Sequence, residues 1–307
     1  MTHARAVILM VFITLLWSIA GVVTRHLDAA RSFEVTFWRS FFNTLALSIA
    51  LTALRGPAVW RSILRSPRAV WVSGVCWSVQ FTAFMIALTL TSVANVLVTM
   101  ALGPLITALF ARFFLHHKLP VRTWAAIFAA GLGIAWMYGQ QAASGASLVG
   151  TLVALLVPLA AAVNFTTLQH VGHHKRVTDT APVQDMLPAV LIGAVISALV
   201  TLPLAYPLQA SMHDLEFLAL LGFVQLAVPC LLVVHLSRQL PAPEIALLSL
   251  LEVIFGVTWA WLGAAEQPSS STLTGGVLVL GALIANEFLA LRSRRSRITM
   301  TALTAQE

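Results

Sequence analysis

The chain has 307 residues, of which 59% are hydrophobic and only 9% are charged, and its mean hydropathy is +0.90. Soluble domains carry about 25% charged residues, so this composition excludes a soluble globular protein and indicates an integral membrane protein. The formal charge of +7 would suit nucleic-acid binding, unless the basic residues gather in loops on one side of a membrane.

Ten stretches of the chain are long and apolar enough to span a membrane, which takes about 20 residues of helix. The links between them are too short to hold an inserted soluble domain. The stretches are continuously apolar, whereas the strands of a membrane barrel alternate. The sequence therefore predicts an all-α integral membrane protein with ten transmembrane helices. In chain order they are expected at 6–24, 34–54, 69–90, 92–114, 123–139, 148–168, 184–204, 215–237, 242–264 and 272–291.

The positions of the Lys and Arg residues predict the orientation. Most of the 18 lie before the first predicted helix, after the last one, or in alternate links between helices. Cytoplasmic loops carry an excess of basic residues, so both termini are expected in the cytoplasm, with 292–307 as a basic cytoplasmic tail. The positive charge then reflects topology in the inner (cytoplasmic) membrane of the cell, and no nucleic-acid partner is needed.

The sequence also repeats itself at an offset of 149 residues. The segment 94–120, ANVLVTMALGPLITALFARFFLHHKLP, lines up with 243–269, PEIALLSLLEVIFGVTWAWLGAAEQPS. Two units, 6–139 and 148–291, then hold five helices each, and an odd number of helices makes the second unit inverted relative to the first. Transporters built in this way bind their substrate near the middle of the membrane, between the units.

Several segments of this scaffold match motifs of a known family. They are LLWSIAGVVTRHL (15–27), Arg39, Gly103-Pro104, LLE (250–252) and GAAE (263–266). With ten helices in two units, the chain resembles the EamA-type branch of the drug/metabolite transporter superfamily. The resemblance implies a secondary transporter that exports amino acids or similar small metabolites across the cytoplasmic membrane by alternating access; proton coupling stays open.

The chain departs from the family pattern at two positions. His117 stands where the family has an acid after the fourth helix, although Glu266 is kept at the equivalent place, and Val253 replaces a common proline. The alternatives are a proton-independent facilitated exchanger, a drug or amine efflux carrier, and a lipid-handling membrane protein. An enzyme is not expected, because the chain has no G-x-S-x-G motif and no phosphate-binding glycine loop.

Glu252 lies near the centre of the ninth predicted helix. A carboxylate at that depth costs at least a few kcal/mol, so it normally faces the bundle interior or a water-filled cavity. Glu252 could exchange a proton, hold a substrate amine, or form a structural hydrogen bond to a Ser or Thr of another helix. The first unit has Gly103 at the equivalent position, so the acid is specific to the second unit.

Arg39 is the second candidate for coupling or gating. It lies about 7 Å inside the outer end of the second predicted helix, at 1.5 Å per residue. It could attract a substrate carboxylate or close an outer gate. Alternatively, its guanidinium snorkels to the interface and has no part in transport.

Further polar and aromatic residues occur inside the spans, where amide and indole groups seldom face lipid. Helix packing explains any one of them, but the set indicates a cavity for a small amphipathic solute. The candidate substrate-binding residues are Trp17, Trp77, Gln80, Phe81, Phe84, Asn95, Thr99, Asn164, Gln225, Ser249, Glu252 and Trp259.

No metal site and no cofactor are expected. The clustered histidines lie in or beside predicted cytoplasmic loops, mixed with Lys and Arg and without a metal-binding motif. They are His116, His117, His170, His173 and His174. The expected partners are a small-molecule substrate and membrane lipid, and the sequence does not predict an oligomeric state.

Overall fold

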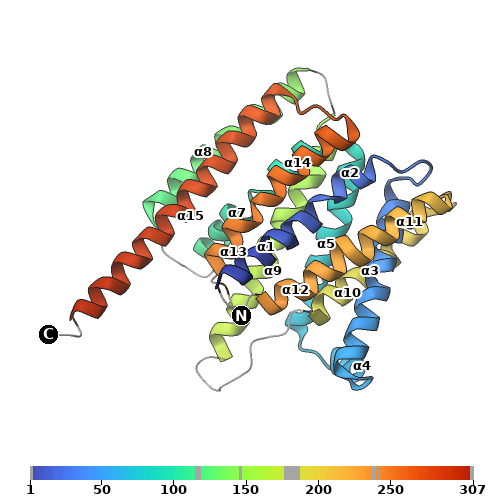
Figure 1. Cartoon of the computed structure of the whole chain (residues 1–307), viewed down its shortest axis with the longest axis horizontal. Helices are drawn as coiled ribbons and strands as arrows, with labels where there is room; N and C mark the ends of the chain where they lie inside the picture. The colour runs from blue at the N-terminus through green and yellow to red at the C-terminus, as the bar shows by residue number, and fades with distance from the viewer. Residues whose placement is uncertain are drawn as a thin grey trace.

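The computed structural model describes residues 3–114, 119–144, 147–175, 187–236, 240 and 242–304. Every regular element in these ranges is a helix, and the helices form one elongated bundle (Figure 1). Ten helical segments of the described chain are long and apolar enough to cross a membrane. The predicted all-α class and the ten predicted spans are therefore confirmed.

The first half contributes α1 (His3–Ser18), α2 (Ala20–Thr24), α3 (Ser32–Arg55), α4 (Ala58–Leu64), α5 (Arg68–Leu90), α6 (Val93–Met100), α7 (Gly103–Phe114) and α8 (Val121–Ala143). The second half contributes α9 (Val149–Lys175), α10 (Leu187–Ala205), α11 (Met212–Leu220), the π-helical segment η1 (Leu221–Ala227), α12 (Val228–Leu236), α13 (Ala242–Ser249), α14 (Leu251–Ala264) and α15 (Ser270–Thr304). The helix predicted to stop at 291 thus continues into the predicted tail.

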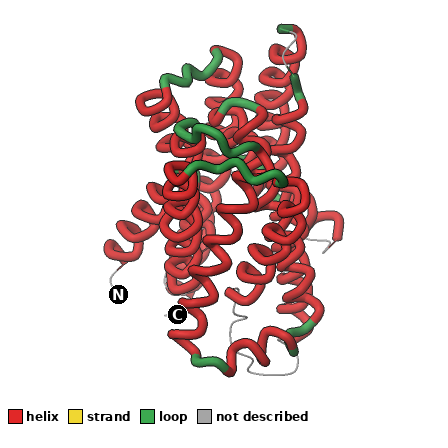
Figure 2. The backbone as a smooth tube through the Cα atoms, turned by 90° about the vertical axis from the view of Figure 1, so that its right-hand side faces the viewer, coloured by secondary structure: helices red, strands yellow, loops and turns green. Residues whose placement is uncertain are grey.

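Helix α1 begins and α15 ends at the same end of the bundle, as ten spans require (Figures 1 and 2). The opposite end, called the far end below, holds the links 25–31, 91–92, 206–211 and 265–269. In the predicted orientation the far end faces away from the cytoplasm.

Four of the ten spans are interrupted. Ile19 separates α1 from α2, Ala101 and Leu102 separate α6 from α7, and Leu250 separates α13 from α14. The fourth interruption is η1, where the chain winds as a π-helix. The breaks at Ala101 and Leu250 lie 149 residues apart, which is the offset of the sequence repeat. The inverted relation of the two units stays a prediction.

The two equivalent breaks have different local causes. Pro104 lacks an N–H and its ring clashes with the carbonyl four residues earlier, so α6 ends at Met100. No proline follows the break in the second half. There, hydrogen bonds of 3₁₀ type from Leu250 N to Leu247 O (3.2 Å) and from Val253 N to Leu250 O (3.1 Å) tighten the chain.

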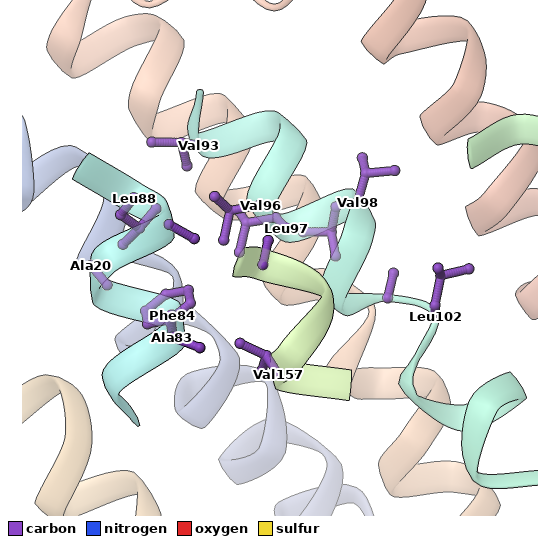
Figure 3. Packing of buried hydrophobic residues seen from close by; sticks show 14 of the residues in the cluster. Ala20, Ala83, Phe84, Leu88, Val93, Val96, Leu97, Val98, Leu102 and Val157 are labelled. Atoms are coloured by element: carbon purple, nitrogen blue, oxygen red, sulfur yellow. The ribbon is translucent and has the colours of Figure 1, made fainter. Parts of the chain in front are cut away.

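Close helix contacts depend on small residues, as is usual in membrane bundles. A Cβ added to Gly256 would lie 2.4 Å from Leu97 Cδ1, so glycine lets α14 approach α6. Leu97 belongs to a large apolar core to which α2, α5, α6 and α9 contribute, among other helices (Figure 3). Helices α8 and α15 lie side by side at one edge of the bundle (Figure 1), where Gly133 faces Gly275.

Candidate functional site

Arg39 is a buried cation inside the described bundle. It is the eighth residue of α3, about 10 Å along the helix from its start, and it is only 2% exposed. The snorkelling alternative is therefore wrong, because the guanidinium does not reach the surface. A charged group at this depth normally faces protein or a cavity and has a partner there.

The partner of Arg39 is the amide of Gln225. Arg39 Nε and Nη2 donate to Gln225 Oε1 at 3.3 and 3.0 Å, and Gln225 Nε2 donates to Trp17 O at 3.0 Å. Gln225 lies in η1, and π-helical turns are frequent at functional sites. Gly222 brings η1 against α3, since a Cβ there would lie 2.9 Å from Arg39 O.

An aromatic ring covers one face of the guanidinium. Arg39 Cζ lies 5.5 Å from the centroid of the Phe84 ring, a cation–π contact worth about 0.5–2 kcal/mol. On the same face of α5, Trp77 and Phe81 have ring centroids 5.4 Å apart. These aromatic residues were predicted to line a cavity, and the structure places Phe84 at Arg39.

Several buried polar atoms of the bundle have no hydrogen-bond partner among the described residues. They are Arg39 Nη1, Asn43 Nδ2 and Oδ1, Ser73 Oγ, Trp77 Nε1, Asn164 Oδ1 and Thr166 Oγ1. Buried polar groups are nearly always paired, and an unpaired one costs about 1–3 kcal/mol. Two of these residues, Arg39 and Asn43, lie one turn apart on α3, and their unpaired atoms mark a place for a ligand or water.

Glu252 lies in the first turn of α14, directly after the break at Leu250. Its side chain lies within the bundle and is partly exposed. It interacts electrostatically with Arg39, as does the buried thiol of Cys230. Within the described part of the chain its carboxylate has no hydrogen bond and no ion pair, so the structural bond to a Ser or Thr is not found.

Trp17, Arg39, Asn43, Phe84, Gln225 and Glu252 are called the central cluster below. Trp17 and Glu252 each lie within two residues of a helix break, and Gln225 lies inside η1. At such interruptions backbone groups leave the regular ladder and side chains can approach them. The Gln225 bond to the Trp17 carbonyl is an example.

Other predicted residues make different contacts. Asn95 Oδ1 accepts a hydrogen bond from Thr272 at 2.6 Å, and Thr99 bonds Tyr138 at 3.1 Å, so this pair links α6 to α8 and α15. Gln80 and Ser249 bond carbonyls of their own helices. The buried face of α14 is Val253, Gly256 and Ala260; Trp259 lies beside it and is 40% exposed.

Asn43 was not predicted, although a signal for it exists. It lies four residues after Arg39 on the same helix face, it is fully buried, and neither amide atom has a partner among the described residues. An amide one turn from an intramembrane arginine could have been found from spacing alone. Gln225 was predicted, but nothing in the sequence pairs it with Arg39, 186 residues away.

A second polar group, called the far-end clamp below, was also missed. Arg25 Nε donates to Glu266 Oε2 at 2.7 Å, while its Nη1 and Nη2 donate to Leu88 O and Thr91 O. Glu266 Oε1 accepts from Val93 N at 2.6 Å. This network ties the end of α14 to α5 and α6 of the first half.

Two more carboxylates complete the far-end clamp. Asp214 accepts hydrogen bonds from the backbone N–H groups of Asp28, Ala29, Ala30 and Ser211. Glu34 accepts from the N–H groups of Gln209 and Ala210 and from the indole of Trp38. Both acids are buried, and their bonds hold the links 25–31 and 206–211 in place.

The described residues contain one group with metal-ligand spacing, and it overlaps the clamp. Ligand atoms of Asp28, His213 and Asp214 lie within 4.8 Å of one another. Asp214 already accepts four backbone hydrogen bonds, so its oxygens are committed. His116 and His117 lie outside the described residues, as do the side chains of His170, His173 and His174.

Comparison with known proteins identifies the relatives of this chain. The profile of the EamA-like transporter family matches residues 4–139. A pseudopaline exporter of Pseudomonas aeruginosa (strain UCBPP-PA14) is 22% identical over 283 residues, covering 91% of this chain and 94% of the relative. An S-adenosylmethionine uptake transporter of Rickettsia conorii is 24% identical over 262 residues, covering 84% of both.

Among solved structures, a crystal structure described without a function matches with a TM-score of 0.63 at 20% identity. The match covers 95% of this chain and 99% of the chain in that crystal structure. That likeness concerns the fold alone. The predicted resemblance to EamA-type transporters is confirmed by the family match and by relatives that are named as transporters.

Proposed function

We propose that the chain exports amino acids or similar small metabolites across the cytoplasmic membrane, from the premise that residues 4–139 match the EamA-like transporter family. The mechanism is alternating access between two five-helix units. The family match, the transporter relatives and the ten apolar helices support a multi-pass transporter of small metabolites. Export is the finer part of the proposal, since one relative is an exporter and another an uptake transporter.

The observation that carries the proposal is the state of Glu252. A structural acid inside a membrane protein is expected to have fixed partners, because it is costly to bury. Glu252 is partly accessible, and its carboxylate has no fixed partner in the described chain. Such a carboxyl can exchange one partner for another, and a proton and a substrate cation are the two partners that a carrier offers.

The break beside Glu252 supports the same function. Broken helices near the middle of the membrane are where secondary transporters place substrate and coupling ions. Here the break recurs at the repeat offset, but only the second half carries the acid, since Gly103 occupies the equivalent position. We assign the coupling role to the half that contains α14.

Proteoliposomes test this role. The purified chain is reconstituted, and uptake of labelled amino acids is followed with and without an imposed pH gradient. We expect the gradient to drive transport in the wild type and to lose its effect in Glu252→Gln. Glu216→Gln, which changes an exposed glutamate on α11, is the matched control and should behave as the wild type.

Two results would contradict the coupling role. If Glu252→Gln transports at an unchanged rate and neither protein responds to pH, Glu252 does not couple transport to protons. If counterflow without a gradient also persists in Glu252→Gln, the chain is a proton-independent exchanger. Movement of a fluorescent lipid between leaflets, without solute transport, would favour lipid handling over the proposed function.

A further inference from the structure

We propose, as an extension that rests on the transport function above, that Arg39 binds a substrate carboxylate and Glu252 binds an amine of the same substrate. The central cluster would then select small zwitterions of the amino-acid type and reject simple amines. This assigns a binding role to Arg39, which the sequence left between gating, carboxylate attraction and no role.

The first argument is the unused donor of Arg39. Two of its three nitrogens donate to one neutral oxygen, Gln225 Oε1, while Nη1 has no acceptor among the described residues. The guanidinium is therefore held in position but not neutralised by contact. A carboxylate at Nη1 would supply the missing acceptor and the missing charge, and charge-assisted bonds of this kind are the strong ones.

Asn43 supplies a second donor beside the first. It follows Arg39 by four residues, so the two side chains leave α3 on one face. Its Nδ2 is buried and has no partner in the described chain. An amide N–H and a guanidinium N–H directed from one helix face suit the two oxygens of a carboxylate. Asn43 Oδ1 stays available to a hydroxyl or amine of the ligand.

Glu252 supplies the opposite charge at a separate point. Glu252 interacts electrostatically with Arg39, but within the described chain the two groups form no ion pair. Among the described residues, each charge therefore lacks a contact partner of opposite sign. A ligand that carries both a carboxylate and an ammonium satisfies both groups, whereas an amine alone leaves Arg39 unpaired and an acid alone leaves Glu252 unpaired.

Aromatic rings provide the apolar surroundings that such a ligand needs. Phe84 stacks on Arg39, and Trp77 with Phe81 continues the same face of α5. Pockets for small molecules combine mostly apolar walls with a few placed polar groups. The central cluster has this composition, with its charges at two separate places.

Matched ligands test the assignment on the full chain in lipid nanodiscs. The twenty L-amino acids are ranked by thermal stabilisation, because a specific ligand stabilises the folded state. The strongest binder is then compared by calorimetry with its amide, which lacks the carboxylate charge, and with its des-amino acid, which lacks the amine. We expect both analogues to bind the wild type at least tenfold more weakly.

Variants show which residue is responsible for each loss of affinity. In Arg39→Gln the amino acid and its amide should bind within twofold of each other, while the des-amino acid stays weaker. In Glu252→Gln the amino acid and its des-amino analogue should become equal. Arg39→Lys, which keeps the charge, should retain a preference for the acid, and it substitutes for Arg39→Gln if that variant does not fold. Arg31→Gln, an exposed arginine of the adjoining link, should change nothing.

The proposal is overturned if no amino acid binds, if the wild type binds the amide as tightly as the amino acid, or if Arg39→Gln keeps the full discrimination. A transport assay with the same ligands separates this failure from failure of the proposed function. Equal transport of amide and amino acid would overturn the zwitterion assignment and leave the transporter intact. Selective binding of zwitterions without transport would overturn the proposed transport function and leave the binding assignment intact.

Discussion

The far-end clamp and the central cluster use the same kinds of residues in opposite ways. In the clamp, Asp214 accepts four backbone hydrogen bonds, and every nitrogen of the Arg25 guanidinium has an acceptor. In the cluster, and within the part of the chain that the structure describes, Arg39 keeps a free nitrogen, Asn43 has no side-chain partner, and Glu252 touches no cation. Both groups are charged and largely buried, so burial alone does not tell them apart.

The number of unused donors and acceptors distinguishes the two regions. A fully paired polar network fixes a geometry, whereas an incompletely paired one keeps capacity for something else. We therefore assign the far-end clamp to holding the links together and the central cluster to binding. Substitutions should separate the two roles, with loss of stability dominating at the clamp and loss of function dominating at the cluster.

The largest effect on stability is expected at Asp214. In Asp214→Ala four backbone N–H groups lose their acceptor, and an unpaired buried N–H costs about 1–3 kcal/mol. Water can replace some of these bonds at the exposed Asp28 and Ala29, so we expect a loss of about 2–4 kcal/mol, measured by denaturation in micelles. Asp28→Ala is the control, since that side chain is 69% exposed. Equal stability of Asp214→Ala and the wild type would refute the structural role.

A smaller loss is expected when Gln225 is changed. Gln225→Leu removes the acceptor of Arg39 and the bond to Trp17 O. Hydrogen bonds inside membrane proteins contribute about 0.6 kcal/mol on average and up to about 1.7, so we expect a loss of about 1–2 kcal/mol together with weaker ligand binding. Gln225→Glu keeps an acceptor for Arg39, but it neutralises the guanidinium by contact and loses the bond to Trp17 O, so it should not restore binding. If Gln225→Leu binds ligand normally, Gln225 does not position Arg39.

The sequence predicted the membrane spans but not the contacts between distant residues. The ten spans were predicted because hydropathy and length are local properties, and the boundaries agree within a few residues for most helices. The Arg39–Gln225 contact joins residues 186 positions apart, and no periodicity encodes such a pair. Trp259 was grouped with Glu252 by helical spacing, but the packed face of α14 centres on Gly256, so Trp259 lies beside it.

The next effect concerns the ion pair of the far-end clamp. Arg25 and Glu266 are 26% and 19% exposed, so solvent weakens their attraction. A double-mutant cycle of Arg25→Gln and Glu266→Gln should give a coupling energy of about 1 kcal/mol. A coupling energy near zero would mean that the bonds from Arg25 to the Leu88 and Thr91 carbonyls hold the far end without Glu266.

The smallest effect on stability is expected at Glu252, although its effect on function is large. Glu252→Gln removes no hydrogen bond and no ion pair of the described chain, and it spares the cost of burying a charge. We therefore expect the free energy of unfolding to stay within about 0.5 kcal/mol of the wild type or to rise, while transport loses its response to a pH gradient. The lost attraction between Glu252 and Arg39 acts against this gain in stability. A loss as large as that of Asp214→Ala would show that Glu252 belongs with the clamp as a structural acid, and the division between the two regions would fail.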